Sequence, residues 1–381
     1  MKALVLSTNN YRSFPSRKQR FARHLAEREY DVLYVEAPVT WLAAVHANQW
    51  RKLCAWRAGT KDQGGHLWTV SPAPWLPFFK KSEKIADRDA HSYFRFLHHL
   101  PGDWTSEIGV VVTYLPFVPE TLRLLGAPVI YDCVDDHSAY PGLIDRATVN
   151  RLEQRTAKLS SAVIATNETI GAKFSAFEEK LSLIQNGVDY ELFAQPSLAW
   201  LNTLKTLPRQ HKFLYVGAMR EWFDTETLGT LAAAFPDFTI DCYGGASSEV
   251  SDKLSAHPNV VFKGTLPQPE IAKSAGQYDL ALIPFRNSPL TAGVDPLKFY
   301  EYASAGLPVV ASMIQALGAF SEESVMLAAT PDEYINAVRS MLTADSLEAR
   351  KRRIESSKRF DWSYRLAEFD RVLDSLPVMH P

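Results

Sequence analysis

Cysteine is scarce in this sequence of 381 residues: Cys54, Cys133 and Cys242 lie far apart and form no CxxC pair. This spacing argues against a zinc site and a disulfide framework, and it suits a reducing compartment. Long apolar runs are missing too, because no stretch approaches the ~20 apolar residues of a membrane span. The apolar run in the N-terminal stretch MKALVLSTNNYRS is too short for a signal peptide. We therefore expect a cytoplasmic protein.

An excess of one charge is also absent, with 41 basic against 43 acidic residues and a net charge of −2. Bulk nucleic-acid binding is therefore not expected. The sequence contains no GxSxG, P-loop, HExxH or CxxC motif. Its one DxD-like pattern, Asp87–Asp89, falls in a charged helical stretch that we interpret as surface. We expect no metal and no cofactor.

What the chain does contain is a long alternation of apolar runs and helix-length segments. Such runs are typical of strands buried on both faces, which form parallel sheets covered by helices. The length predicts about two domains at ~100–200 residues each. The fold class is therefore α/β, with two Rossmann-like parallel-sheet domains. The predicted strands are 2–7, 31–36, 108–114, 127–134 and 161–166, then 212–217, 238–245, 259–264, 278–285 and 307–312.

The boundary between the two series is expected near 194–210, where no strand fits. We assign residues 1–195 to the first domain and 205–361 to the second. The amphipathic segment 360–376 predicts a terminal helix, and we expect residues 362–381 to pack back on the first domain. Open parallel sheets bind ligands at the carboxyl ends of their strands, so two such domains facing each other would form a cleft.

The stretch VDPLKFYEYASAGLPVVAS, residues 294–312, carries two charges ahead of a strand. Asp295 followed by proline predicts a helix start, and Gly306 with Pro308 a stop, so we expect a helix over 296–304. Lys298 and Glu301 are then neighbours on one face. They form either a solvated ion pair worth a few tenths of a kcal/mol or an anion site in the first helical turn.

Three loops of the second series follow predicted strands. In YVGAMREWFD (215–224), Gly217 lets the backbone approach a ligand, Met219 suits a flat ring and Arg220 suits a phosphate. FKGTLPQPE (262–270) is a second strand-end loop, and IPFRNSP (283–289) places Phe285 at a third strand end.

Two loops of the first series are polar. YDCVDDH (131–137) places Asp135, Asp136 and His137 at a strand end, where a general base belongs, although one aspartate could instead cap a helix. STNNYRSFPSRKQR (7–20) has no glycine, so it is not a dinucleotide fingerprint. It suits an acceptor with hydroxyl or phosphate groups, or is simply solvated. Its polar residues include Asn9, Asn10, Arg12, Arg17 and Lys18.

Residues 41–84 mix aromatic and basic side chains, which is typical of interfacial membrane segments. The alternative is a core helix followed by a proline-rich loop. The residues are Trp41, Trp50, Trp56, Trp75, Phe78 and Phe79, among Arg51, Lys52, Arg57, Lys80, Lys81 and Lys84.

Together these motifs resemble the two-domain GT-B glycosyltransferases of family 4 and related groups, in particular enzymes of the teichuronic-acid-pathway and xanthan-pathway glucuronosyltransferase type. The resemblance covers nearly the whole chain. It rests on VLSTNNYRSFPSRKQRF (5–21), YDCVDDHSAY (131–140), QNGVD (185–189), YVGAMREWFD (215–224), FKGTL (262–266) and, above all, PLKFYEYASAGLPVV (296–310).

The resemblance implies a nucleotide sugar on the C-terminal domain and an acceptor on the N-terminal domain. It implies that Lys298 contacts the phosphates and Glu301 the ribose hydroxyls, and that Asp135, with Asp136 beside it, is the candidate base. The other implied nucleotide-binding residues are Gly217, Met219, Arg220, Thr265, Leu266 and Phe285. The implied acceptor residues are Asn10, Arg12, Arg17 and His137.

One position departs from the family pattern. Retaining members carry a second glutamate eight residues before the ribose glutamate, where this sequence has Gly293. This departure favours inversion, with Asp135 deprotonating the acceptor hydroxyl. Without a metal, Lys298, helix N–H groups and Arg220 would stabilise the leaving diphosphate, and domain closure would exclude water.

The sequence thus predicts a metal-independent glycosyltransferase of bacterial surface glycan biosynthesis. It would move a sugar from a nucleotide diphosphate sugar, with UDP favoured, to a lipid-linked or polysaccharide acceptor at the inner face of the cytoplasmic membrane. One alternative is a nucleotide-sugar epimerase, which would turn over donor without acceptor. Another is a non-catalytic binding subunit, against which Asp135, Lys298 and Glu301 argue.

Overall fold

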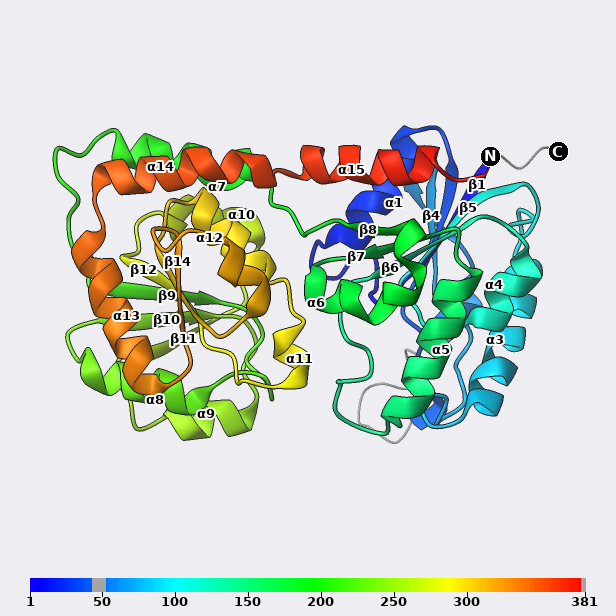
Figure 1. The fold of residues 1–381 in the computed structure, drawn as a ribbon, viewed down its shortest axis with the longest axis horizontal. Coiled ribbons are helices and arrows are strands. Elements are labelled where there is room, and N and C mark those ends of the chain that lie inside the picture. The colour runs from blue at the N-terminus through cyan, green and yellow to red at the C-terminus, as the bar shows by residue number, and fades with distance from the viewer. Residues whose placement is uncertain (43–52, 378–381) are drawn as a thin grey trace. The chain divides into compact units, whose positions relative to one another are not determined.

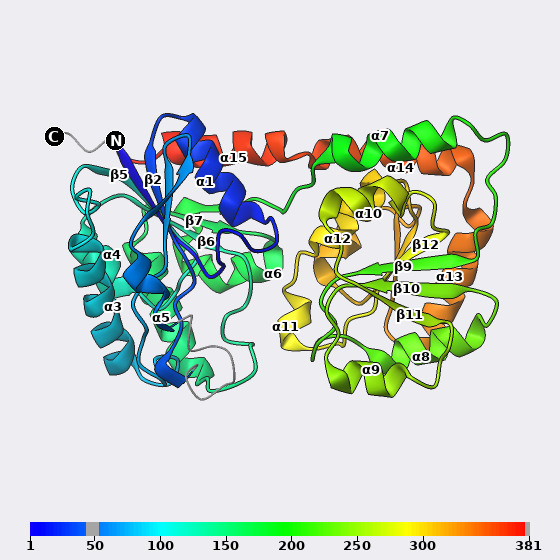
Figure 2. The same cartoon turned by 180° about the vertical axis from the view of Figure 1, so that it is seen from behind.

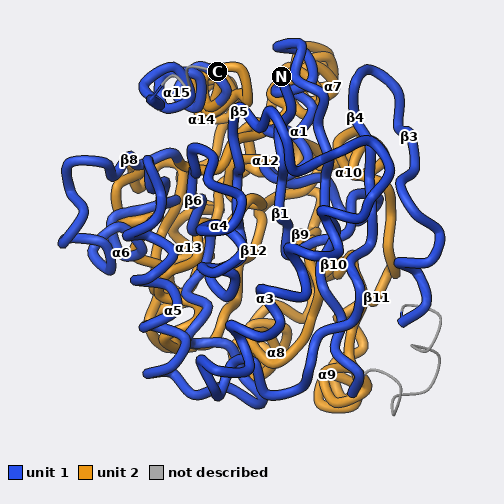
Figure 3. The backbone as a smooth tube through the Cα atoms, turned by 90° about the vertical axis from the view of Figure 1, so that its right-hand side faces the viewer, with its two compact units in different colours: residues 1–184, 366–381 blue, residues 185–365 orange. Residues whose placement is uncertain are grey.

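The chain forms two compact units in the computed structural model, which describes residues 1–42 and 53–377. The first unit comprises residues 1–184 together with the segment from Leu366 onward, and the second comprises Gln185–Arg365. Figure 3 colours the two units separately. The chain passes into the second unit at Gln185, ten residues before the end predicted for the first domain.

The first unit is built on an eight-stranded sheet (Figures 1 and 2). Its strand order is β3-β4-β2-β1-β5-β6-β7-β8, and every pair is parallel except β3 with β4. The strands are β1 (Lys2–Leu6), β2 (Asp31–Val35), β3 (Lys61–Gly64), β4 (Leu67–Val70), β5 (Ile108–Thr113), β6 (Val129–Cys133), β7 (Ala162–Ala165) and β8 (Leu181–Leu183).

Five of these strands are those that the apolar runs predict, and β3, β4 and β8 are additional. The polar strand β3 and the short β8 form the two edges of the sheet, where few apolar residues are needed. The helices of this unit are α1 (Arg17–Glu27), η2 (Ala55–Ala58), α3 (Glu83–His98), α4 (Pro119–Leu125), α5 (Arg146–Leu159), α6 (Glu168–Gly171), η3 (Ala172–Lys180) and α15 (Trp362–Asp374).

Helices cover both faces of this sheet, which explains why its central strands are continuously apolar. Helices α3, α4 and α5 lie on one face, and α1 lies on the other (Figures 1 and 2). Beyond residue 365, α15 packs against α1: the rings of Phe21 and Phe369 stack at 4.3 Å, and Arg28 donates to Asp370 at 2.6 Å. The C-terminal segment is thus joined to the first unit by apolar and ionic contacts.

The second unit carries a six-stranded parallel sheet of order β11-β10-β9-β12-β13-β14. Its strands are β9 (Lys212–Val216), β10 (Thr239–Tyr243), β11 (Val260–Gly264), β12 (Leu280–Ile283), β13 (Val309–Ser312) and β14 (Val325–Ala328). The sequence predicts the first five, and β14 at the edge is additional. The helices are α7 (Tyr190–Leu201), α8 (Thr225–Ala234), α9 (Ser248–Leu254), α10 (Gln268–Ala275), α11 (Pro289–Ala292), α12 (Leu297–Ser304), η4 (Gln315–Ala319), α13 (Pro331–Ala344), α14 (Leu347–Ser357) and η5 (Lys358–Phe360).

Part of the aromatic segment 41–84 belongs to the core of the first unit. Trp75 is buried, with its ring edge-on to Phe79 and Tyr93. Trp41 and Phe78 remain exposed, at 55% and 44%. The predicted Trp50, Arg51 and Lys52 lie outside the described residues. In the part of the chain that the structure describes, no helix is both long and apolar enough to cross a membrane.

Asp89 corrects the interpretation of the DxD-like pattern as surface. It lies on α3 with its side chain buried, and both carboxylate oxygens accept hydrogen bonds from Leu76 N, at 3.0 and 3.1 Å. Burial raises the pKa of Asp89 to about 6, although the Leu76 bond opposes the shift. The carboxylate holds the loop that contains Leu76 and is not a surface charge.

This buried carboxylate gives a pH prediction. Because the pKa of Asp89 is higher in the folded protein, its protonated form contributes stability that is complete below pH 4 and is lost as the pH rises through 6. The loss should be about 2–3 kcal/mol. In urea unfolding between pH 4 and 7, Asp89→Asn should gain stability relative to wild type by this amount. A difference that stays flat with pH would contradict the assignment.

Candidate functional site

A cavity of about 360 Å³ opens at the carboxyl ends of β1, β2, β5 and β6 in the first unit. These strands are consecutive neighbours in the sheet, so the residues that follow them converge at one edge. Its lining residues are Thr8, Asn9, Lys18, Ala37, Pro38, Phe79, Lys80, Leu115, Phe117, Asp135, His137 and Tyr140.

Asp135 provides the carboxylate of this cavity. It follows β6 by two residues, and its Oδ2 accepts a hydrogen bond from the Tyr140 hydroxyl at 3.1 Å. Burial raises the pKa of Asp135, while the charge of Lys18 and the Tyr140 bond oppose the shift. A carboxylate with a raised pKa is a stronger base than an exposed aspartate.

Asp136 does not line the cavity, which corrects its place beside Asp135 as a catalytic candidate. Its Oδ1 accepts from Ser138 N and Oγ and pairs with Lys173 Nζ at 2.7 Å. Lys173 also pairs with the buried Glu153 at 2.6 Å. Partial burial raises the pKa of Asp136, but the bonds from Lys173 and Ser138 outweigh it and hold the pKa below its ordinary value. Asp136 therefore fixes the loop that carries Asp135.

Helix capping does not explain either aspartate. The next helix, α5, is capped by Asp145, whose Oδ2 accepts from Thr148 N at 2.9 Å. The alternative that Asp135 or Asp136 caps a helix is therefore wrong.

His137 is buried on the wall of the cavity, and its Nε2 has no hydrogen-bond partner in the described part of the chain. Its ring stacks on Tyr140 at 6.2 Å and meets Phe117 edge-on. Burial, reinforced by the charges of Lys18, Lys80 and Lys173, lowers the pKa of His137 to about 3. The imidazole is therefore neutral near pH 7 and can exchange a hydrogen bond with a ligand.

Arg17 corrects part of the predicted acceptor loop. Its side chain is only 2% exposed; it pairs with the fully buried Asp132 at 2.9 Å and donates to the Ile184 carbonyl at 2.7 Å. Arg17 thus joins α1 to the sheet and does not face the cavity. The other two predicted residues of this loop, Asn10 and Arg12, are exposed and do not line the cavity.

Two lysines line the cavity, of which Lys18 was predicted only as one of the polar residues of the loop 7–20. Lys18 follows Arg17 on α1, and its Nζ donates to Thr8 Oγ1 at 2.5 Å. Lys80 belongs to segment 41–84, for which the sequence left membrane contact and core packing as alternatives, and its amine lies over the Phe117 ring at 5.2 Å. The available signal for Lys80 was its position directly after Phe79, in a run whose aromatic side chains pack inward.

In the second unit, Lys298 and Glu301 form an ion pair of 2.7 Å on α12. Glu301 is only 3% exposed, and it also accepts from Gln268 Nε2 at 2.7 Å. Gln268 begins α10, directly after β11, and was not predicted from the sequence. Because Glu301 is buried and Lys298 is only 18% exposed, this is not the solvated surface pair that the sequence left open.

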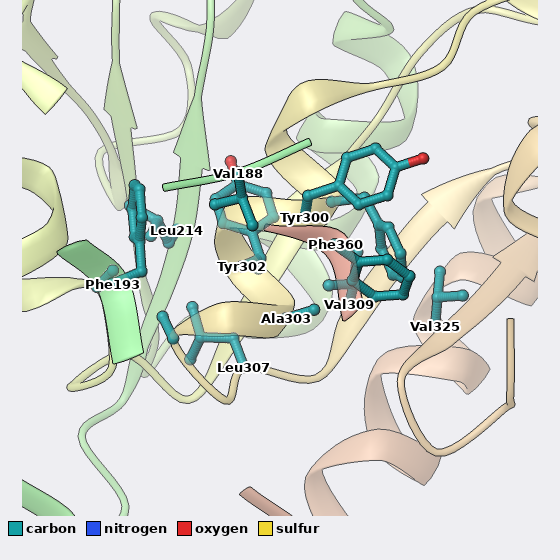
Figure 4. Packing of buried hydrophobic residues seen from close by; sticks show 14 of the residues in the cluster. Val188, Phe193, Leu214, Tyr300, Tyr302, Ala303, Leu307, Val309, Val325 and Phe360 are labelled. Carbon is teal, nitrogen blue, oxygen red and sulfur yellow. The ribbon is translucent and has the colours of Figure 1, made fainter. Parts of the chain in front are cut away.

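Aromatic packing fixes α12 in place (Figure 4). Tyr300 and Tyr302 are buried in the core cluster with Phe360 and Val188, and the Tyr302 hydroxyl accepts from Val216 N at 2.7 Å. The expected helix over 296–304 is thus α12, but Asp295 is not its N-cap. The Asp295 carboxylate instead accepts from Asn186 N and the Tyr300 hydroxyl, both at 2.6 Å.

The strand-end loops of this unit approach one another through their backbones. Gly217 N donates to Tyr243 O at 2.8 Å, and Gly244 N donates to Gly264 O at 2.8 Å. Gly244 has φ +131°, and a Cβ there would lie 2.0 Å from the Gly217 carbonyl oxygen. Glycine is therefore required where β9 and β10 end.

The side chains predicted around the nucleotide divide into two groups. Met219 is fully buried in the core, which corrects its assignment as a surface for a flat ring. Phe285 is half-buried against Phe223. Exposed at the carboxyl edge of the sheet are Arg220, Thr265 and Leu266.

The described residues contain no group of three or more His, Cys, Asp or Glu side chains arranged to hold a metal ion.

Part of the sequence matches a known protein family and a known relative. Residues 210–344 match the family model "Glycosyl transferases group 1". TuaH of Bacillus subtilis (strain 168), provisionally named a teichuronic acid biosynthesis glycosyltransferase, is 26% identical over 196 residues; these are 48% of this chain and 49% of the relative, about half its length.

Solved structures share the whole fold. The structure of HepE from Anabaena in complex with UDP aligns with a TM-score of 0.67 at 15% identity, covering 99% of this chain and all of that chain. Sucrose-phosphate synthase from Thermosynechococcus elongatus aligns with a TM-score of 0.69 at 15% identity over 98% of both chains. With its two parallel-sheet units, the chain has the GT-B fold; its second unit matches the group 1 glycosyltransferases, and the chain is a distant homologue of TuaH.

Proposed function

We propose that this protein transfers a sugar from a UDP-sugar to an acceptor hydroxyl, with the donor on the second unit and the acceptor on the first. The observation that carries the proposal is the largely buried Lys298–Glu301 pair on α12, within the residues that match the glycosyltransferase family. In this pair, the Lys298 ammonium offers a cation for phosphate, and the Glu301 carboxylate offers a hydrogen-bond acceptor for hydroxyl groups.

On the donor side, the two charges have separate tasks. The Lys298 ammonium would pair with the diphosphate, helped by the first N–H groups of α12 and by the exposed Arg220. The Glu301 carboxylate, freed from Lys298 but still held by Gln268, would accept hydrogen bonds from the ribose hydroxyls. Phe285 and the backbone at Thr265 and Leu266 would border the base. Stabilisation of the leaving diphosphate would thus come from the protein's own cations.

On the acceptor side, Asp135 would take the proton of the attacking hydroxyl. The hydroxyl oxygen forms the new bond to the anomeric carbon, the bond from that carbon to the diphosphate breaks, and UDP leaves with the bonding electrons. The inversion that Gly293 favoured is not supported, since members of this family are typically retaining. Inversion therefore forms no part of the proposal.

The choice of UDP is supported by related structures: HepE has been solved with UDP and with UDP-glucose. A thermal-shift titration with UDP, GDP, ADP, dTDP and UDP-glucose tests the proposal. UDP and UDP-glucose should raise the unfolding midpoint, since a ligand that binds only the native state adds RT ln(1 + [L]/Kd) to stability. If no nucleotide raises the midpoint, the donor site is absent and a non-catalytic role takes its place.

The naming of TuaH for teichuronic acid biosynthesis supports a surface-glycan acceptor, lipid-linked or polysaccharide. Contact with the inner face of the cytoplasmic membrane is a further part of the proposal. It rests on Trp41, Phe78, Lys81 and Lys84, which are exposed in the described part of segment 41–84.

This contact gives a prediction. Each lysine near an anionic surface is worth about 1 kcal/mol, so Lys81→Glu combined with Lys84→Glu should weaken binding to phosphatidylglycerol vesicles by about tenfold or more. Co-sedimentation measures the effect, with the exposed Lys205→Glu in the second unit as control. Equal sedimentation of the double variant and wild type would remove the membrane contact from the proposal.

A further inference from the structure

Two lysine amines meet at the cavity of the first unit. Lys18 comes from α1, is buried, and places its amine 5.4 Å from the centre of the Tyr114 ring. Lys80 comes from the loop before α3 and lies over the rings of Phe117 and Phe79, at 5.2 and 5.7 Å. Both line the cavity that contains Asp135.

Neither amine forms an ion pair in the described part of the chain, although the charges of Asp135 and Asp132 act on Lys18. Within residues 1–42 and 53–377, no carboxylate lies within 4.0 Å of the Lys18 or Lys80 amine. The cavity's own carboxylate, Asp135, accepts a hydrogen bond from Tyr140. A buried ammonium without a partner is costly, and burial accordingly lowers the pKa of both lysines. Two cations that form no ion pair at one cavity therefore destabilise the folded protein in the absence of a ligand.

The other residues that line the cavity add a polar group and flat apolar surfaces. His137 Nε2 is buried and unpartnered among the described residues, so a neutral imidazole can contribute one hydrogen bond. Phe79, Phe117 and Pro38 supply flat apolar walls of the kind that pack against the face of a sugar ring. The cavity thus combines two cations, a carboxylate and aromatic surface.

We propose that the acceptor is an anionic sugar, carrying a phosphate or carboxylate group that pairs with Lys18 and Lys80 while its attacking hydroxyl faces Asp135. This inference rests on the proposed function, which places the acceptor on the first unit. A neutral acceptor would leave both ammonium groups without an anion in the cavity, which costs more than pairing them.

Binding of such an acceptor would also act on the base. The charge of Lys18 opposes the raised pKa of Asp135, so an anion that neutralises Lys18 makes the carboxylate more basic. Asp135 would then be a strong base only when an acceptor is present.

The test measures probe binding to the full-length protein saturated with UDP, by isothermal titration calorimetry. The probes are glucose 1-phosphate, glucuronate and glucose. The variants are Lys18→Met and Lys80→Met, which keep the apolar stem of each side chain, with Lys81→Met as the matched control because Lys81 is adjacent, exposed and outside the cavity.

We expect one of the charged probes to bind, glucose to bind at least about tenfold more weakly, and each cavity variant to lose about tenfold or more in affinity. Lys81→Met should bind like wild type. The stronger charged probe identifies the anion as phosphate or carboxylate. Without probe, Lys80→Met should unfold at the same midpoint as wild type or higher, because it removes a half-buried charge that forms no ion pair.

The inference would be overturned if glucose bound as tightly as both charged probes, or if charged-probe affinity were unchanged in Lys18→Met and Lys80→Met. A lowered midpoint of Lys80→Met without probe would also overturn it, since the amine would then be stabilising the fold. Stabilisation of the protein by UDP tests the donor site of the second unit separately. If UDP stabilises the protein and the charged probes do not bind, only this inference fails; if UDP does not stabilise it, the proposed function fails.

Discussion

Asp135→Asn should lower the rate of sugar transfer by about 10²–10⁴-fold, the usual contribution of a positioned general base. The asparagine keeps the shape of the side chain and can still accept from the Tyr140 hydroxyl, so the cavity should persist. It cannot take the proton of the attacking hydroxyl. UDP binding should be unchanged, because Asp135 belongs to the first unit and the donor site to the second.

Asp136→Asn is the matched control for this substitution. Asp136 is paired with Lys173 outside the cavity, so its loss should lower the unfolding midpoint and leave most of the transfer rate. Release of UDP from UDP-glucose in the presence of acceptor measures both variants. Transfer at the wild-type rate in Asp135→Asn, or a larger loss in Asp136→Asn, would show that the base is assigned to the wrong residue.

The pH dependence of wild-type transfer follows from the same carboxylate. Because burial raises the pKa of Asp135, kcat/KM should fall with acidification at a pH above the ordinary range of an aspartate. Asp135→Asn should remove this acidic limb from the profile. A limb that persists in the variant would belong to another group.

Lys298→Ala should abolish the stabilisation of the protein by UDP and should also weaken the free protein. Loss of a charged contact to the diphosphate is worth about 1.5–3 kcal/mol, at least tenfold in affinity. The free protein should lose about 3 kcal/mol, because Glu301 would remain buried and charged with only Gln268 as a partner. Thermal shift with UDP and urea unfolding without it measure the two effects.

A second ion pair of the same unit is the control. Lys273 and Glu270 have the same i,i+3 spacing and a similar distance, 2.8 Å, but the side chains are 66% and 50% exposed. Lys273→Ala should therefore change stability by less than about 0.5 kcal/mol and leave UDP binding intact. Adding Glu301→Gln to Lys298→Ala should restore stability without restoring UDP binding. If Lys298→Ala retains the full UDP shift, the nucleotide phosphates do not lie at α12.

The physical basis of these predictions was only partly visible in the sequence. Continuous apolar runs separated by helix-length segments determined the two parallel sheets, because a strand covered on both faces must be apolar throughout. The position of Asp135 after β6 and the i,i+3 spacing of Lys298 and Glu301 followed from the same local patterns. Such properties depend on a few neighbouring residues, and a single sequence displays them.

The tertiary structure alone decided which side chains face a ligand. Asp135 and Asp136 are adjacent in sequence, yet Lys173 pairs with Asp136 and leaves Asp135 to the cavity. Arg17 is held by Asp132, and Lys80 joins Lys18 from another part of the chain. These partners are 37 to 115 residues apart, and no periodicity or motif relates them. Their pairing is determined by where the strand ends converge, which only the folded sheet establishes.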